Sequence, residues 1–131
     1  PAFLNGEKIN VSSNPTLDDS LIATGFPYYD FNMNKRILHC LEYFMEHTQG
    51  IRRFGSAATD LAYIACGRFD AFYEYSLNVW DVAAGAFIVQ QAGGKVSDFS
   101  KGKNYMYGRE MVAANSFVFD EFSDVIQRFL S

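Results

Sequence analysis

Several features that would identify a protein class are scarce or absent in this 131-residue sequence. No apolar run approaches the roughly 20 residues of a membrane-spanning helix, so we expect no membrane partner. Acidic residues outnumber basic ones by 15 to 11, and the net charge of −4 argues against a nucleic acid held by phosphate contacts. No positively charged segment precedes an apolar one at the start, so we expect no signal peptide and a cytoplasmic location.

Spacings typical of three common kinds of site are also missing. His39 and His47 have no acidic or cysteine partner at ligand spacing, which disfavours zinc. No serine lies in a G-x-S-x-G setting, which disfavours a serine hydrolase. Gly93-Gly94 lacks the G-x-G-x-x-G spacing of a dinucleotide loop.

Cysteine is rare, and the start of the chain is unusual. Cys40 and Cys66 lie in apolar, helix-like sequence without C-x-x-C spacing, so we expect reduced core residues of an intracellular protein, with a disulfide as the weaker alternative. The chain opens at Pro1, without methionine, directly in strand-like sequence. We therefore expect a piece of a longer chain.

The content that remains is that of one domain with a real core. Apolar residues make up 49% of the sequence, including 13 Phe and 8 Tyr. Asn5-Gly6 supplies the positive backbone angles of a two-residue hairpin turn. The apolar patterns and the glycine and proline breaks predict a hairpin over 2–11, strands over 21–24, 51–54, 70–75, 95–99 and 111–114, and helices over 32–47, 57–66, 79–92 and 117–130. This alternation predicts an α/β layered sandwich with a mixed β-sheet flanked by helices, as one domain over 1–131.

The strongest candidate for a functional residue is Asp81, which follows the chain's only tryptophan, Trp80. If Asn78 caps the helix, Asp81 lies at the third helical position, where it also complements the helix dipole by about 0.3–1 kcal/mol. Trp80 and the small residues 83–86 are expected to pack this helix closely and hold the carboxylate. Mg²⁺ binds one or two carboxylates together with phosphate and water, so Asp81 is a possible ligand that cannot make a site alone.

Two further segments are candidates for contact with a ligand. Ser56 is a plausible helix cap after Gly55, and N–H groups at a helix start can meet anionic or hydroxylated ligands. An ordinary cap would look the same, and both roles are compatible. Glu74, in F-Y-E-Y, would by itself be interpreted as an exposed glutamate on a strand.

The Trp80-Asp81 segment, with Gly93-Gly94 downstream, resembles the C-terminal signature of the inositol monophosphatase family. These are Mg²⁺-dependent, lithium-sensitive sugar-phosphate phosphatases. The opening A-F-L-N-G-E-K-I-N-V-S resembles the family's hairpin, and L-I-A-T-G-F-P-Y resembles its bacterial branch. The resemblance covers nearly the whole chain and implies the C-terminal half of the inositol monophosphatase fold.

The resemblance also implies roles for individual residues. Asp81 matches the aspartate that ligates a catalytic Mg²⁺ and lies near the substrate's hydroxyl groups. Glu74 matches the glutamate that hydrogen-bonds an inositol hydroxyl. Gly55, Ser56 and Ala57 match the G-[ST]-A segment, whose backbone faces the substrate ring. Arg52 matches an arginine before that turn, with an expected role in bracing the dimer or the site wall.

The family's other metal ligands are missing. They belong to an N-terminal half that carries a glutamate and a D-P-[IL]-D-G-T motif, and that motif is absent here; Asp18-Asp19 lies in a Pro/Ser loop and does not match it. The missing carboxylates are those that activate the attacking water. We therefore expect this chain alone to supply one metal ligand and part of the substrate wall, and not to catalyse.

The function implied by the resemblance is hydrolysis of a phosphomonoester of inositol or a similar polyol, with Mg²⁺, by a homodimer of the intact protein. A close alternative keeps the superfamily and changes the substrate to a nucleotide 3′-phosphate or fructose bisphosphate. An alternative of a different class is a non-catalytic module that dimerises or binds a protein.

Overall fold

The computed structural model describes residues 1–26 and 33–131 of the chain. The elements in this part are β1 (Ala2–Leu4), β2 (Glu7–Ile9), β3 (Leu21–Thr24), α1 (Asn34–His47), β4 (Gly50–Arg52), α2 (Ala57–Ala65), β5 (Ala71–Tyr75), α3 (Val79–Gln91), β6 (Lys95–Ser97), β7 (Glu110–Ala114) and α4 (Phe119–Leu130). They follow the predicted order. Residue 32, where the first helix was expected to begin, lies outside the described residues.

Two predicted strands end two residues earlier than expected. The strand expected over 95–99 is β6, which ends at Ser97. The strand expected over 51–54 is β4, which ends at Arg52. The chain leaves the sheet there because the Phe54 ring packs against Tyr63 and Phe69, with ring centroids 5.5 and 5.1 Å away. This departure directs the backbone toward the start of α2.

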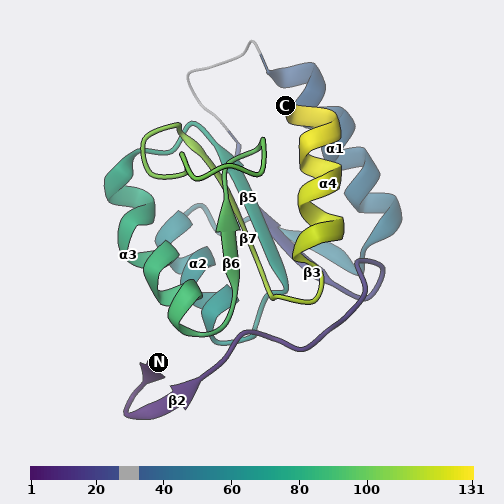
Figure 1. Ribbon diagram of the computed structural model, residues 1–131. Coiled ribbons are helices and arrows are strands. Elements are labelled where there is room, and N and C mark those ends of the chain that lie inside the picture. The colour runs from purple at the N-terminus through teal and green to yellow at the C-terminus, as the bar shows by residue number, and fades with distance from the viewer. Residues whose placement is uncertain (27–32) are drawn as a thin grey trace.

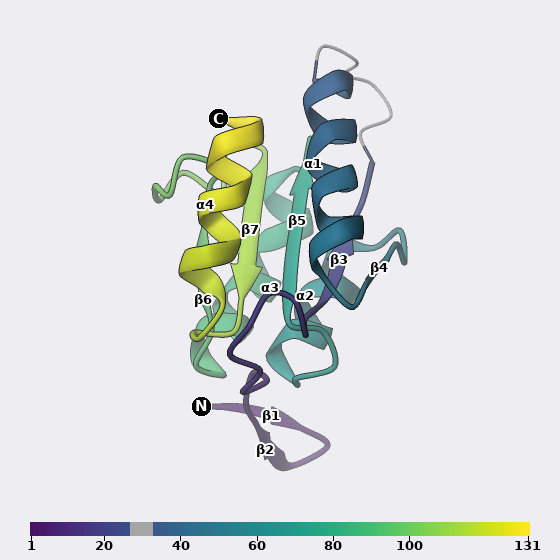
Figure 2. The same ribbon diagram turned by 90° about the vertical axis from the view of Figure 1, so that its right-hand side faces the viewer.

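The N-terminal hairpin forms as predicted. β1 and β2 pair antiparallel, with Ala2 opposite Ile9 and Leu4 opposite Glu7. Asn5 and Gly6 have φ of 52° and 83°, the left-handed pair that a type I′ turn requires. The hairpin is a two-stranded sheet of its own and extends below the main sheet in Figure 2.

The main sheet is mixed, in the order β4-β3-β5-β7-β6. β3 pairs parallel with both β4 and β5, whereas β7 pairs antiparallel with both β5 and β6. The carboxyl ends of β3, β4 and β5 therefore lie at one edge of the sheet, where ligands bind in many α/β proteins. Gly25, Gly55 and Ser76 follow the three strands at that edge.

Both faces of the sheet are covered by helices. Alternate residues of β5 point to opposite faces: Ala71 and Tyr73 pack in one core cluster with residues of α1 and α4, and Phe72 packs in another with residues of α2 and α3. Figure 1 shows the sheet between the α1–α4 layer and the α2–α3 layer. The predicted layered α/β sandwich is confirmed.

The packing of α3 is explained by its small residues and not by its tryptophan. A side chain at Gly85 would stand 2.6 Å from Leu61, so glycine there allows α3 to approach α2 closely. Trp80, in contrast, is 78% exposed, and the expectation that it packs the helix was wrong.

The remaining sequence-based expectations concern cysteines and the membrane. Both cysteines are free, as predicted, and Cys40 is buried, but Cys66 is partly exposed, so its expected place in the core was wrong. Across residues 1–26 and 33–131, no helix is both long and apolar enough to cross a bilayer.

Candidate functional site

A pocket of about 350 Å³ lies at the carboxyl end of β5, beside the N-termini of α2 and α3. Every site residue predicted from the sequence lines it. The lining residues are Gly55, Ser56, Ala57, Ala58, Glu74, Ser76, Leu77, Trp80 and Asp81. The fold thus brings three separate segments of the sequence to one pocket.

The start of α2 forms the first wall. Ser56 is the N-cap, as predicted: its backbone is extended and its Oγ accepts a hydrogen bond from the N–H of Thr59 at 3.3 Å. Gly55 has φ of +81°, a left-handed conformation that favours glycine. The first N–H groups of a helix have no partner within it, so those of Ala57 and Ala58 are positioned to donate to a ligand.

The start of α3 forms the second wall. Asn78 is the N-cap and Asp81 occupies the third helical position, as predicted. The backbone N–H of Asn78 donates to Oδ2 of Asp81 at 2.9 Å, as in a capping box. This bond holds the carboxylate at the pocket wall and leaves Oδ1 available to a ligand.

Glu74, on β5, forms the back of the pocket and is partly buried rather than exposed. Burial raises the pKa of its carboxyl group to about 7. The negative charges of Asp60 and Asp81 raise this pKa further, and the positive charge of Arg53 opposes them. Glu74 therefore changes its protonation near neutral pH, and each form offers a ligand different hydrogen-bonding groups.

Asp60 is a residue that the sequence reasoning missed. It lies in the first turn of α2 and is 0% exposed. No donor among the described residues reaches either of its carboxylate oxygens, and burial raises its pKa to about 6. A signal was present: helical spacing places Asp60 on the same stripe as Ala57, Leu61 and Ile64, all of which are buried.

The rim of the pocket contains a second feature that the sequence did not reveal. Ser76 and Arg109 have φ of +75° and +66°, conformations that cost energy in residues other than glycine. The Nη2 of Arg109 donates to the Ser76 hydroxyl at 2.8 Å, and the Ser76 N–H donates to the Arg109 carbonyl at 2.8 Å. Strained backbone of this kind often occurs at functional sites.

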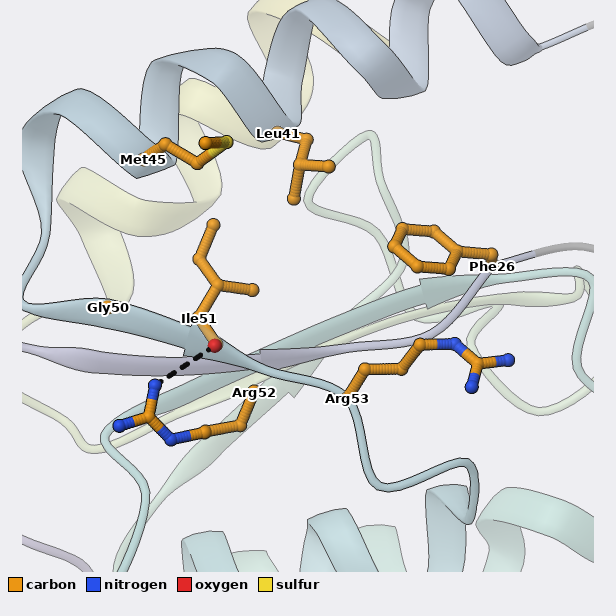
Figure 3. Close-up of a pocket in the computed structure, with 7 residues that line it drawn as sticks. All are labelled: Phe26, Leu41, Met45, Gly50, Ile51, Arg52 and Arg53. Atoms are coloured by element: carbon orange, nitrogen blue, oxygen red, sulfur yellow. Dashed lines mark hydrogen bonds between the residues drawn. The ribbon is translucent and has the colours of Figure 1, made fainter.

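A second, more apolar pocket of about 460 Å³ lies between α1 and β4. In Figure 3, Leu41 and Met45 of α1 point toward Ile51 and Phe26. Arg52 lines this pocket, with its Nη1 donating to the Ile51 carbonyl at 3.1 Å. Arg52 is not among the residues that line the pocket of Asp81, so its expected role in bracing the dimer or the site wall stays a prediction. No carboxylate lines this second pocket in the described part of the chain.

The carboxylates of the first pocket fit part of the ligand set that a Mg²⁺ ion needs, and not all of it. Within residues 1–26 and 33–131, no three His, Cys, Asp or Glu side chains are grouped to hold a metal ion. The lining residues include the carboxylates of Glu74 and Asp81 and, among the residues described, no lysine or arginine. A phosphate ester would meet a negative wall here, so a bound cation would have to offset the repulsion.

These features define a three-layer α/β/α domain with a carboxylate-lined pocket at the ends of parallel strands. The chain belongs to the inositol monophosphatase family, whose model matches residues 1–127. It is 42% identical over 128 residues to Nus factor SuhB of Pseudomonas aeruginosa, an alignment that covers 96% of this chain and 47% of that protein.

Solved structures agree with this assignment. The extragenic suppressor protein suhB from Bartonella henselae matches with a TM-score of 0.90 and 37% identity, over 96% of this chain and 48% of that one. Inositol monophosphatase from Anabaena matches with a TM-score of 0.84 and 33% identity, over 95% of this chain and 52% of that one. The chain spans about half the length of these relatives.

Proposed function

We propose that the protein carrying this chain hydrolyses a phosphomonoester of inositol or a similar polyol with Mg²⁺, and that this chain supplies one metal ligand and part of the substrate wall. The observation that carries the proposal is the gathering of Gly55, Ser56, Ala57, Glu74 and Asp81 in one pocket of a chain that belongs to this family. Residues 1–131 would form the C-terminal domain, and the D-P-[IL]-D-G-T half would come from outside them.

The proposal gives each residue the role that the family resemblance implies, and the position of each residue is consistent with that role. Asp81 would hold the metal through Oδ1, since Oδ2 accepts the N–H of Asn78. Ionised Glu74 would accept a hydrogen bond from a substrate hydroxyl. The N–H groups at the start of α2 would donate to the polyol ring or its phosphate. When bound, Mg²⁺ would neutralise the phosphate charge and lower the pKa of a water molecule.

Two properties of the intact protein complete the proposal. We infer a homodimer that acts in the cytoplasm, as the family resemblance implies. The absence of a nucleic-acid partner stays a prediction from the net charge of −4.

A nucleotide 3′-phosphate or fructose bisphosphate stays the alternative substrate. The test is Mg²⁺-dependent release of phosphate from each of the three esters by the same preparation.

A second candidate is a non-catalytic role in binding another protein. It is favoured by the name of the relative from Pseudomonas aeruginosa, Nus factor SuhB. The mass of the native protein in its source cell tests the two candidates in part. A product near 14.8 kDa would lack the other half and support the binding module. A product near twice this length would restore the enzyme, and Mg²⁺-dependent release of phosphate would then decide, because the relative named Nus factor SuhB is also about that long.

A further inference from the structure

The glycine that follows β3 lies against the carboxyl group of Glu74. β3 and β5 run parallel, with Thr24 opposite Tyr73, so the next residues, Gly25 and Glu74, are neighbours at the strand ends. A Cβ atom at Gly25 would stand 2.3 Å from Oε1, 2.4 Å from Cδ and 2.7 Å from Oε2 of Glu74. These are its three nearest neighbours, and all are closer than van der Waals contact allows. The carboxyl group of Glu74 therefore occupies the space that a side chain at position 25 would fill.

The backbone does not explain why glycine is present. Gly25 is not among the residues with positive φ, so its conformation is open to alanine. It differs in this respect from Gly55, whose φ is +81°. The obstacle to a side chain at position 25 is the far end of Glu74, which is flexible and can move. A methyl group there would thus displace the carboxyl group while the fold persists.

The charges around Glu74 make its place dependent on this space. Asp60 and Asp81 repel its carboxylate and Arg53 attracts it. In Figure 3 the side chain of Arg53 lies near Phe26, the residue after Gly25, and its guanidinium carbon is 5.3 Å from the centre of the Phe26 ring. A carboxylate pushed out of its space would move into a pocket that already contains Asp81.

We propose that Gly25 is a positioning residue for Glu74: the missing side chain at position 25 creates the space that holds the Glu74 carboxyl group, and so determines where the pocket presents this hydrogen-bonding group. The consequence for substrate recognition rests on the function proposed above. The positioning itself rests only on the contact between the two residues.

The test uses the longer protein that carries this chain with the D-P-[IL]-D-G-T half, in four variants: Gly25→Ala, Gly50→Ala, Glu74→Asp, and Gly25→Ala combined with Glu74→Asp. A Glu74→Gln variant serves for assignment. Gly25→Ala fills the space. Gly50→Ala is the matched control, since a methyl group there would meet the flexible end of Arg52 at 3.2 Å and not Glu74. Gly25→Ala combined with Glu74→Asp restores room, because aspartate is shorter by one methylene. The first readout is the ¹³C resonance of the Glu74 carboxyl group, assigned by its loss in Glu74→Gln. The second is the KM for inositol 1-phosphate.

We expect the Glu74 resonance to move in Gly25→Ala and to stay in place in Gly50→Ala. We expect KM to rise about tenfold in Gly25→Ala, the effect of one lost hydrogen bond to a charged group, with kcat changed less than threefold. In the Glu74→Asp background, Gly25→Ala should change KM less than twofold.

Three results would overturn the proposal: an unmoved Glu74 resonance in Gly25→Ala, an equal rise in KM in both backgrounds, or failure of the double variant to fold. The last would mean that something other than Glu74 requires glycine at position 25. If the wild-type protein releases no phosphate, the proposed function fails instead, and the carboxyl resonance alone still decides whether Gly25 positions Glu74.

Discussion

The burial of Asp60 leads to a prediction about stability and pH. Asp60→Asn replaces the carboxyl group by an amide of the same shape, and so removes the ionisation while keeping the packing. The carboxyl group is 0% exposed and has no donor among the described residues, so its ionised form is poorly stabilised in the folded protein. We therefore compare the free energy of unfolding of the variant with that of the wild type at each pH. We expect this difference to favour the variant more at pH 8 than at pH 3.5.

The magnitude follows from the pKa. The Asp60 carboxyl group titrates near 3.8 in the unfolded chain and at about 6 in the folded one. Below pH 3.8 it is protonated in both states. Between these two values the folded state retains a proton that the unfolded state releases, so the free energy of unfolding falls as pH rises. A pKa shift of about 2 units corresponds to about 3 kcal/mol. Above pH 7 the difference in free energy of unfolding between Asp60→Asn and the wild type no longer changes with pH.

Urea unfolding at pH 3.5 to 8 measures this difference. Any cost of an amide without hydrogen-bond partners is the same at every pH and cancels when the two ends of the range are compared. Running both proteins in a Glu74→Gln background removes the titration of Glu74, whose pKa is also raised. Asp120→Asn, in the exposed first turn of α4, is the matched control for the exchange of a carboxyl group for an amide in a first helical turn. Parallel pH curves for Asp60→Asn and the wild type would refute the reasoning.

Three other predictions follow from the packing. Ser76→Gly should raise the free energy of unfolding by up to about 1 kcal/mol in urea, because glycine adopts the φ of +75° without strain and the lost hydrogen bond from Arg109 to the Ser76 hydroxyl is exposed; a loss of stability would contradict this. Gly85→Ala should lower it by about 1–3 kcal/mol, because the new methyl group would stand 2.6 Å from Leu61; an unchanged melting temperature would contradict the close contact of α2 and α3. Cys66 should react with a thiol reagent in the native protein, whereas Cys40, fully buried and with a pKa raised to about 12, should react only on unfolding; two fast thiols would contradict this.

Much of the fold could be predicted because local signals agreed with the tertiary structure. Asn5-Gly6 specifies its turn through backbone angles alone, and Ser56 and Asn78 cap the helices that follow them. The end of β4 could not be predicted, because it depends on the contact of Phe54 with rings that lie later in the sequence. Trp80 was misjudged because its exposure depends on which side of α3 faces α2.

Some features of the candidate site could likewise be predicted from the sequence, and others could not. The five site residues predicted from the sequence lie in one pocket, although their roles stay predictions. The environment of Glu74 could not be predicted, because the space at Gly25 and the charge of Asp60 come from two other elements. Asp60 was not considered from the sequence, although its position on the buried stripe of α2 distinguishes it from an exposed acid in a first turn.

The most direct test of the account is Mg²⁺-dependent release of phosphate from inositol 1-phosphate, measured for this chain and for a longer protein that carries it with the D-P-[IL]-D-G-T half. The account predicts no activity in the 131-residue chain and activity in the longer protein. It also predicts that Asp81→Asn abolishes this activity and lowers the melting temperature only by the small amount expected from a weakened helix cap. Full activity in the Asp81→Asn variant, or no activity in the longer protein with any of the three esters, would contradict it.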